Sequence, residues 1–506
     1  MSIAAGLGAA LAHPPFGFWP GLLGFGVLLW LLDSADAARP LRSAFWRGWL
    51  AGSAYFLVST WWVGEAFLVD VAAHGWQAPF AVGFLASGLG LLWGAAGTAY
   101  RWLAPKGWER ALVFAAVFGL FEWLRGHILT GFPWDLPGEA WRAGDWISQS
   151  ASVIGAYGLS VVTLAMFAAA GLWIGPDSRR TKAIASGIAA AVFVALGLFG
   201  AVRLAAPSPA PAGPRIRVVQ PNIDQAVKWT PASFRAIFEN YMALTAQAPG
   251  PGQRTPDVVI WPESAIPANS ADYLAEGSWT HAELMAALRP GQILLMGAVR
   301  TEGARYYNAL LAIRRDPGGL TRLGVYDKHH LVPFGEYMPA DALMGAIGFK
   351  ALVHITDDGF TEGPAPAPMT VPGLPPLQAL ICYESLFPAF VADDHPRPAW
   401  IANVSNDAWF GKTSGPWQHL NLASYRAIEE GLPMVRATPT GVSAVIDARG
   451  RTLDLLGQSA RGVIDADLPG TAPPPFYRRL RDWPFWIMTL GGLALALWRK
   501  RIASKS

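Results

Sequence analysis

The hydrophobic positions of this chain gather into eight apolar runs, seven of them before residue 205 and one near the C-terminus. The runs lie at 3–13, 16–32, 45–69, 79–103, 110–129, 153–174, 184–204 and 483–498. A helix needs roughly 20 apolar residues to cross a bilayer. The pattern therefore predicts a multi-pass α-helical membrane domain with eight transmembrane helices.

The first run leaves two interpretations open. It is short, and His13, Pro14 and Pro15 follow it at a place where a helix is expected to end. Residues 3–32 therefore predict either two spans joined by a tight turn or one span preceded by a re-entrant or signal-like segment.

The polar middle of the chain predicts a separate domain. Residues 215–480 have the composition of an ordinary globular domain of about 265 residues, which is long enough to bury its own core. Proline-rich stretches at 205–214 and 471–475 mark its two ends. The predicted division is residues 1–205 with seven helices, residues 206–482 as the middle domain, and residues 483–506 as the eighth helix with a basic tail.

Positive charge indicates which side of the membrane the middle domain faces. Lys and Arg cluster in the connections near 39–47, 101–110 and 179–182 and in the tail at 499–505, whereas the connection at 70–78 has none. Basic connections stay in the cytoplasm. This asymmetry predicts an extracytoplasmic domain, whether or not the first run crosses.

Composition supports a membrane protein and excludes some functions. Hydrophobic residues make up 52% and charged residues 15% of the chain, whereas an average soluble domain has about 25% charged residues. The net charge of +3 is too small to indicate nucleic-acid binding. With one cysteine the chain forms no intramolecular disulfide, so the compartment has to be inferred from charge.

The middle domain alternates short apolar runs with more helical stretches. This alternation predicts a layered α/β domain whose sheet strands are almost wholly apolar. The expected strands are residues 216–220, 258–261, 293–299, 377–381, 400–404 and 442–446.

Three of the patterns in this domain end in residues that can carry chemistry. Glu263 and Cys382 each follow an apolar strand, and Lys328 begins the stretch Lys-His-His-Leu-Val-Pro-Phe-Gly-Glu336. A helix starting near Tyr383 would place Cys382 at its N-terminus, where the dipole and a nearby lysine favour the reactive thiolate. A carboxylate could then act as general base.

Each of these residues also has an ordinary structural interpretation. A lone cysteine is more often a small buried hydrophobe, a glutamate at this place often caps a helix, and a lysine is usually solvated. His329 and His330 suggest a metal, but no third ligand follows at the usual spacing, so we expect neither a metal nor another cofactor.

Taken together, the order Glu263, Lys328 and Cys382 resembles the catalytic triad of the nitrilase, or carbon–nitrogen hydrolase, superfamily. The whole chain, with this domain between the seventh and eighth spans, is similar to the apolipoprotein N-acyltransferase family. The similar stretches are Phe121-Glu-Trp-Leu-Arg-Gly126, Thr130-Gly-Phe-Pro-Trp134, Val219-Gln-Pro-Asn-Ile223, Trp261-Pro-Glu-Ser264, Lys328 to Tyr337, and Asn403-Val-Ser-Asn-Asp-Ala-Trp-Phe-Gly411.

The resemblance implies that residues 206–482 form a catalytic nitrilase-like αββα sandwich on the periplasmic side of a bacterial inner membrane. It also implies a two-step acyl transfer. Cys382 would take the sn-1 acyl chain of a phospholipid, with Glu263 as base and Lys328 stabilising the oxyanion. The thioester would then pass the chain to the α-amino group of a diacylated apolipoprotein. We expect a monomer. Five further residues are implied as supporting or substrate-binding: Glu336, Tyr383, Glu384, Trp229 and Trp409.

Two further features concern lipids. The unusually apolar stretch 342–353 predicts a loop or short helix that dips into the membrane, unless it packs in the domain core. Glu122 and Arg125 lie in or at the edge of the fifth run, where ionisable groups are costly. They either bind a phospholipid head group or form a structural ion pair.

Two other functions remain open at this stage. A membrane-anchored amidase would share the first half-reaction and use water in the second. A non-catalytic lipid-binding scaffold would not need Glu263, Lys328 and Cys382 together.

Overall fold

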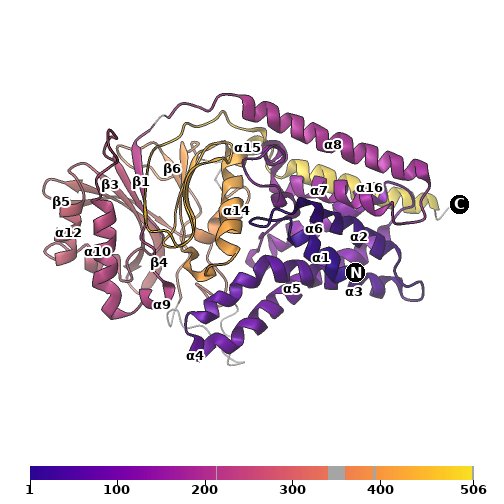
Figure 1. Cartoon of the computed structure of the whole chain (residues 1–506), viewed down its shortest axis with the longest axis horizontal. Helices are drawn as coiled ribbons and strands as arrows, with labels where there is room; N and C mark the ends of the chain where they lie inside the picture. The colour runs from indigo at the N-terminus through magenta and orange to yellow at the C-terminus, as the bar shows by residue number, and fades with distance from the viewer. Residues whose placement is uncertain (212, 340–358, 391–394, 504–506) are drawn as a thin grey trace. The chain divides into compact units, whose positions relative to one another are not determined.

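The computed structural model describes residues 1–211, 213–339, 359–390 and 395–503, which form two compact units. The helical unit comprises Met1–Pro207, Thr413–Gly431 and Pro473–Ser506, and the α/β unit comprises Ser208–Lys412 and Leu432–Ala472 (Figure 1). The helical unit therefore takes one helix, α14, from the middle of the chain.

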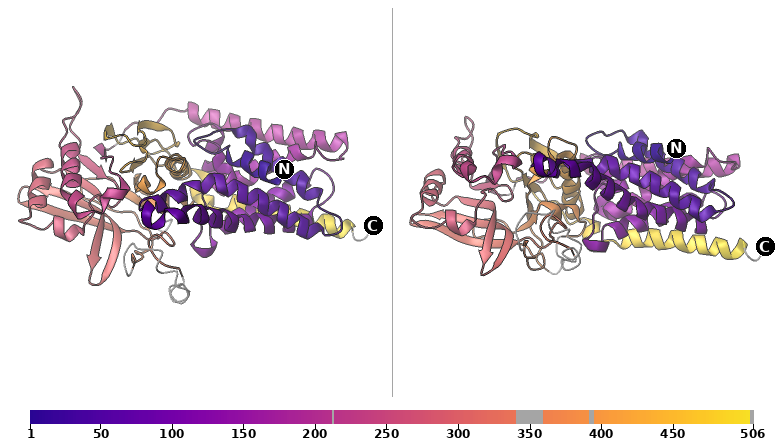
Figure 2. Two further views of the ribbon diagram at one scale, coloured as in Figure 1. Left: turned by 60° about the horizontal axis from the view of Figure 1, so that its bottom comes forward. Right: turned by 90° about the horizontal axis from the view of Figure 1, so that it is seen from below.

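The helical unit consists of long helices that run alongside one another (Figure 2). Three apolar segments are long enough to cross a membrane within the described part of the chain: Val71–Leu103, Ile147–Gly171 and Arg179–Ala205. The helices are α1 (Ser2–Ala10), α2 (Leu23–Asp33), α3 (Pro40–Thr60), α4 (Val71–His74), α5 (Ala78–Leu103), α6 (Arg110–Arg125), α7 (Ala151–Gly171), α8 (Arg179–Ala205), α14 (Gly415–Glu430), α15 (Phe476–Leu480) and α16 (Trp483–Ala503).

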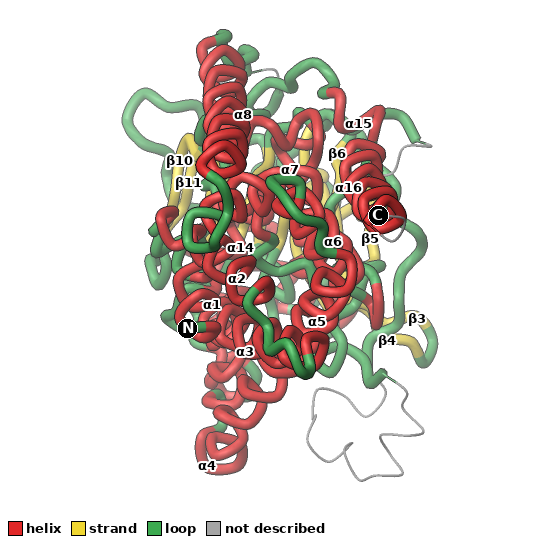
Figure 3. Tube along the Cα trace, turned by 90° about the vertical axis from the view of Figure 1, so that its right-hand side faces the viewer, coloured by secondary structure: helices red, strands yellow, loops and turns green. Residues whose placement is uncertain are grey.

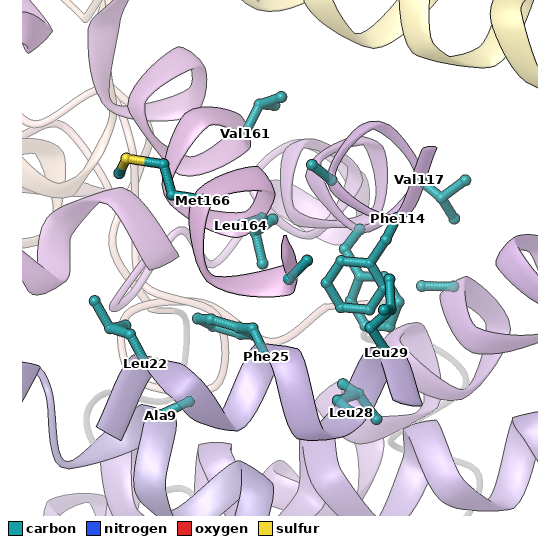
Figure 4. Packing of buried hydrophobic residues seen from close by; sticks show 14 of the residues in the cluster. Ala9, Leu22, Phe25, Leu28, Leu29, Phe114, Val117, Val161, Leu164 and Met166 are labelled. Carbon is teal, nitrogen blue, oxygen red and sulfur yellow. The ribbon is translucent and has the colours of Figure 1, made fainter. Parts of the chain in front are cut away.

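Large apolar side chains and small residues share the core of this unit. Phe25 and Leu29 of α2, Phe114 of α6 and Leu164 of α7 lie in one buried cluster (Figure 4). Elsewhere the helices touch through their backbones: a Cβ added at Gly6 would lie 2.0 Å from the carbonyl oxygen of Ala51. Small residues at such crossings are how helices pack closely within a membrane.

The α/β unit contains two sheets, and their strands are coloured yellow in Figure 3. All six strands expected from the sequence are present, and five further strands (β4, β5, β8, β10 and β11) extend the sheets. The first sheet has the order β11-β1-β2-β3-β4-β5, from β1 (Arg215–Gln220), β2 (Val258–Trp261), β3 (Ile293–Glu302), β4 (Arg305–Asp316), β5 (Gly319–Asp327) and β11 (Gly462–Asp467). The second has the order β10-β9-β8-β7-β6, from β6 (Leu377–Ile381), β7 (Trp400–Val404), β8 (Met434–Ala437), β9 (Ser443–Ile446) and β10 (Thr452–Leu456).

Apolar side chains that point alternately to the two faces of the first sheet form two apolar layers. Val258 and Leu295 share one buried cluster with Ala379 and Ala402 of the second sheet, so the two sheets share a core. Successive side chains of a strand point to opposite faces. Val259 accordingly packs outward, in a second cluster with residues of α10 (Phe234–Thr245) and α12 (Trp279–Ala287), which lie beside the first sheet (Figure 1).

The central strands of both sheets run parallel, which brings their carboxyl ends to matching edges. Ile216 pairs with Val258 and Val258 with Ile293 in the first sheet, and Leu377 pairs with Trp400 in the second. Ligands of α/β sheets bind at the carboxyl ends of such strands. The functional side chains described next lie at those ends.

Candidate active site

Three strand ends bring Glu263, Lys328 and Cys382 into one cluster. Glu263 comes two residues after β2, Lys328 directly after β5 and Cys382 directly after β6. The Lys328 ammonium lies 3.5 Å from Oε1 of Glu263, and both side chains are close enough to the thiol to shift its pKa. Residues more than 100 positions apart therefore share one buried site.

Glu263 is held by donors on both of its oxygens. Oε1 accepts from Nδ2 of Asn308 at 2.6 Å, and Oε2 accepts from the backbone N–H of Asn406 at 2.7 Å. The backbone of Glu263 also lies so close to Gly297 that an added Cβ there would come within 2.4 Å of the Glu263 Cα. Glycine on β3 is thus a geometric requirement for the position of the carboxylate.

Lys328 is paired with a second carboxylate, Glu336. Its Nζ lies 2.9 Å from Oε1 and 2.8 Å from Oε2 of Glu336, and the lysine is 1% exposed. Burial opposes the charged form, but Glu336 and Glu263 outweigh it and raise the pKa of Lys328 above its ordinary value. The side chain is therefore a cation at any physiological pH.

Glu384 connects the Lys328 segment to the end of β6. Its Oε1 accepts from Tyr326 Oη at 2.9 Å and from the backbone N–H of His329 at 2.8 Å. Its Oε2 accepts from the N–H of Ile381 at 2.7 Å. Burial raises the pKa of Glu384 to about 7, although these donors oppose the rise. Neighbouring Tyr383 is buried.

Cys382 occupies a strained turn between β6 and a short 3-10 helix, Cys382–Leu386. Its φ is +50°, a conformation that costs a non-glycine residue about 1–3 kcal/mol and is concentrated at functional sites. Burial, followed by the charge of Glu263, raises the pKa of the thiol to about 12, and Lys328 and Ser405 only partly oppose this. The expectation that the site favours a resting thiolate is therefore wrong, because a single 3-10 turn cannot offset burial beside a carboxylate.

Comparison with known proteins assigns the chain to a family. The profile of the carbon–nitrogen hydrolases matches residues 215–472, and that of the apolipoprotein N-acyltransferase N-terminal domain matches residues 5–170. The apolipoprotein N-acyltransferase of Caulobacter vibrioides is 52% identical, over 97% of this chain and 92% of the relative. The chain belongs to the apolipoprotein N-acyltransferase family. It is an N-acyltransferase enzyme with membrane helices.

Other members of the family match at lower identity. The apolipoprotein N-acyltransferase of Sinorhizobium medicae is 42% identical, over 96% of this chain and 92% of its own. A solved CN-hydrolase superfamily protein from Xanthomonas campestris aligns with 55% of this chain and 96% of its own, at 20% identity and a TM-score of 0.36.

The buried surroundings of the cluster include residues that the sequence did not single out. Arg436 pairs with Asp407 at 2.8 Å with both side chains fully buried, and Ser405 donates to Asp407 at 2.8 Å. Asn308 donates to Glu336 at 2.8 Å as well as to Glu263. The sequence contained one signal that could have identified Asn308 as a site residue. Asn308 directly precedes the apolar run 309–313 of β4, and polar residues are seldom buried in such a strand.

The two tryptophans expected to support the family's reaction lie toward solvent. Trp229 follows the single helical turn α9 (Gln225–Lys228) and is 50% exposed. Trp409 lies in the 3-10 helix Asp407–Phe410 and is partly exposed.

In the helical unit, Glu122 and Arg125 contact one another. Arg125 Nε donates to Oε2 of Glu122 at 3.1 Å, and Trp93 Nε1 donates to its Oε1 at 2.7 Å. Arg125 also donates to the carbonyl oxygen of Trp134 at 2.9 Å, and both charged side chains are 1% exposed. This arrangement is that of an internal ion pair that ties α6 to the following loop.

Two remaining expectations concern a metal and the apolar segment. No group of three His, Cys, Asp or Glu side chains suited to a metal ion occurs among the residues that the structure describes. His329 Nδ1 lies 2.9 Å from the carbonyl oxygen of Gly363. The apolar stretch 342–353 lies outside the described residues.

Proposed function

We propose that this enzyme moves the sn-1 acyl chain of a phospholipid, through a thioester on Cys382, to the α-amino group of an N-terminal diacylglyceryl-cysteine. The observation that carries the proposal is the buried cluster of Glu263, Lys328 and Cys382 in a chain of this family. The relatives are named for apolipoprotein as acceptor, and the candidate membrane helices of this chain suit a lipid donor.

In the first step Glu263 acts as general base. Because the thiol is protonated at rest, its proton passes to the Glu263 carboxylate as sulfur attacks the ester carbonyl. Lys328 and a backbone N–H near Cys382 stabilise the oxyanion, which is typically the largest electrostatic contribution to catalysis. The carbonyl–oxygen bond then breaks, and Glu263 returns the proton to the leaving lysophospholipid.

In the second step the acceptor amine attacks the thioester. Glu263 takes a proton from the amine, the carbon–nitrogen bond forms, and the carbon–sulfur bond breaks. The proton then passes to the departing sulfur, which restores the thiol. Each half-reaction returns Glu263 to its ionised state, so no cofactor is required.

Supporting side chains keep the cluster in register. Glu336 and Glu384 hold the Lys328 segment through hydrogen bonds. Tyr383 shapes the pocket, and Trp229 lies on a loop that gates it. We assign Trp409 to the same pocket. Glu122 and Arg125 shape the helical unit from within, as their mutual pairing favours.

We further propose the membrane arrangement predicted from charge. Residues 1–205 and 483–506 provide eight crossings, or seven if the nine-residue α1 does not cross, and residues 206–482 lie on the periplasmic side of the bacterial inner membrane. A monomer with this arrangement meets both lipid-anchored substrates at the outer surface of that membrane.

The test is a mass measurement in two stages. Purified protein is mixed with phospholipid micelles, and its intact mass is taken before and after hydroxylamine. We expect an added acyl mass that hydroxylamine removes and that is absent in Cys382→Ala. An absent adduct, or one that persists in Cys382→Ala, contradicts the thioester.

Addition of a synthetic diacylated lipopeptide to the acylated enzyme separates the two enzyme classes. A transferase forms a triacylated amide, whereas an amidase-like enzyme releases free fatty acid at the same rate with or without the peptide. Peptide with an acetylated N-terminus is the matched control, because it lacks the nucleophilic amine.

A further inference from the structure

A second lysine lies buried beside the proposed base. The single turn α9 is capped by Asp224, whose side chain accepts from the N–H of Ala226 at 2.8 Å. Residues three apart share a face of such a turn. Gln225 and Lys228 occupy that face and are 4% and 1% exposed, whereas Val227 between them is 49% exposed.

The buried face of α9 is connected to Glu263 through one residue. Asn406 donates its side-chain N–H to Oε1 of Gln225 at 3.2 Å, and its backbone N–H to Oε2 of Glu263 at 2.7 Å. Neither Lys228 Nζ nor Gln225 Nε2 has a hydrogen-bond partner among the described residues. Lysine is almost never fully buried unless it is paired, so this ammonium is not explained by the local fold.

Charge distribution assigns Lys228 a counter-ion. Lys328 is held by both oxygens of Glu336, so those two charges offset each other. Glu263 is the carboxylate whose charge acts on Lys228. Glu263 therefore faces two cations: Lys328 at 3.5 Å, which Glu336 also holds, and Lys228, whose charge acts on it without a direct hydrogen bond.

We propose that Lys228 is a second active-site cation beside Glu263, which offsets the charge of that carboxylate before proton transfer and the charge of the oxyanion after it. The inference rests on the proposed function, in which Glu263 receives the thiol proton. When Glu263 has accepted the thiol proton, it no longer carries the charge that balances Lys228. Negative charge forms on the substrate oxygen in the same step, and the charge of Lys228 then stabilises it. No additional reactant is needed, and Lys228 remains protonated throughout.

The groups around this pair determine how the acylation rate depends on pH. Lys228 faces Glu263 from α9 and lies 5.6 Å from the Trp229 ring centre. Glu263 is also faced by Lys328 after β5, and Asp407 and Glu263 both act on Cys382. Burial lowers the pKa of Lys228 to about 8, against the opposing effect of Glu263. The cation is therefore lost at a pH where Lys328 keeps its charge.

The experiment measures the rate of Cys382 acylation by phospholipid micelles from pH 5 to 10, with no amine acceptor present. In the wild type we expect the rate to fall above pH 8, as Lys228 loses its proton. In Lys228→Met, which lacks the cation at every pH, we expect a low rate below pH 8 and no fall above it. In Lys228→Arg, which keeps the cation, we expect a rate near that of the wild type below pH 8 and no fall above it.

Lys412→Met is the matched control, since Lys412 is exposed in the same α/β unit, and it should follow the wild type. Superimposable profiles for the wild type, Lys228→Met and Lys228→Arg would overturn the inference while leaving the thioester mechanism intact. Absence of an adduct in the wild type would instead overturn the proposed function itself. If Lys228→Met does not fold, the alkaline limb of Lys228→Arg alone decides, because a limb unchanged from the wild type contradicts the proposal.

Discussion

Replacement of Glu336 by glutamine tests whether Lys328 must be held by a charged partner. Each hydrogen-bond partner of the Glu336 carboxylate is a donor. Oε1 accepts from Lys328 and Asn308, and Oε2 accepts from Lys328 and from the backbone N–H of Val332, which is 2.8 Å away. An amide in either orientation therefore turns its NH₂ group toward a donor. One buried donor is left without an acceptor, and Lys328 loses its closest opposite charge.

The magnitude follows from those contacts. An unsatisfied buried polar group costs about 1–3 kcal/mol, and a loss of about 2 kcal/mol in transition-state stabilisation corresponds to a rate reduction of about thirty-fold. Lys328, 3.5 Å from Glu263, is then expected to pair with the base itself, which further lowers the acylation rate.

The assay is the rate of adduct formation on Cys382 under single-turnover conditions, followed by intact mass. Glu239→Gln is the matched control, because Glu239 is an exposed glutamate on α10 whose carboxylate contacts Arg235 at 3.4 Å. Wild-type acylation rates in Glu336→Gln, with the variant folded, would refute the view that Glu336 holds Lys328 for catalysis.

Three further predictions concern the same unit. The rate at which iodoacetamide alkylates Cys382, followed by intact mass, should still increase with pH above pH 9, because burial raises the pKa of the thiol to about 12. A rate that reaches a plateau below pH 8 would show a resting thiolate instead. Glu263→Gln should lower the acylation rate by about a hundred-fold or more, as expected when a general base is lost, while tryptophan fluorescence stays native-like; near-normal acylation would exclude Glu263 as the base. Arg436→Met should lower the free energy of unfolding by about 3–5 kcal/mol in urea titrations, because Asp407 loses the opposite charge with which it is buried. The double variant Asp407→Asn with Arg436→Met should recover part of that loss, and no recovery would contradict the pairing argument.

The strands on which the site is built could be predicted because their pattern is local. Residues 258–261 and 377–381 are uninterrupted apolar runs, typical of strands buried on both faces. The five strands that were missed include β5 and β10, whose exposed and polar positions lack such a pattern. Their pairing depends on neighbouring strands that are distant in the sequence.

The chemistry of Cys382 could not be predicted in the same way. The sequence placed Cys382 after a strand and at the N-terminus of an expected helix, which favoured a thiolate. Whether a thiol ionises depends on how deeply it is buried and on which charges surround it, and these come from β2, β5 and β7, far along the chain. The pairing of Glu122 with Arg125 was weighed from their spacing, but the part played by Trp93 and Trp134 emerged only from helix packing.

The sequence by itself determined the strands of the sheet core, and it predicted the division into membrane and polar regions and the three candidate catalytic side chains. These follow from hydrophobic periodicity and charge, which act over a few residues. The tertiary structure alone decided which side chains meet: the pair of Lys328 with Glu336, the buried Lys228 facing Glu263, and the inclusion of α14 in the helical unit. Such contacts join distant segments, and their energies depend on burial and distance, which exist only once the chain has folded.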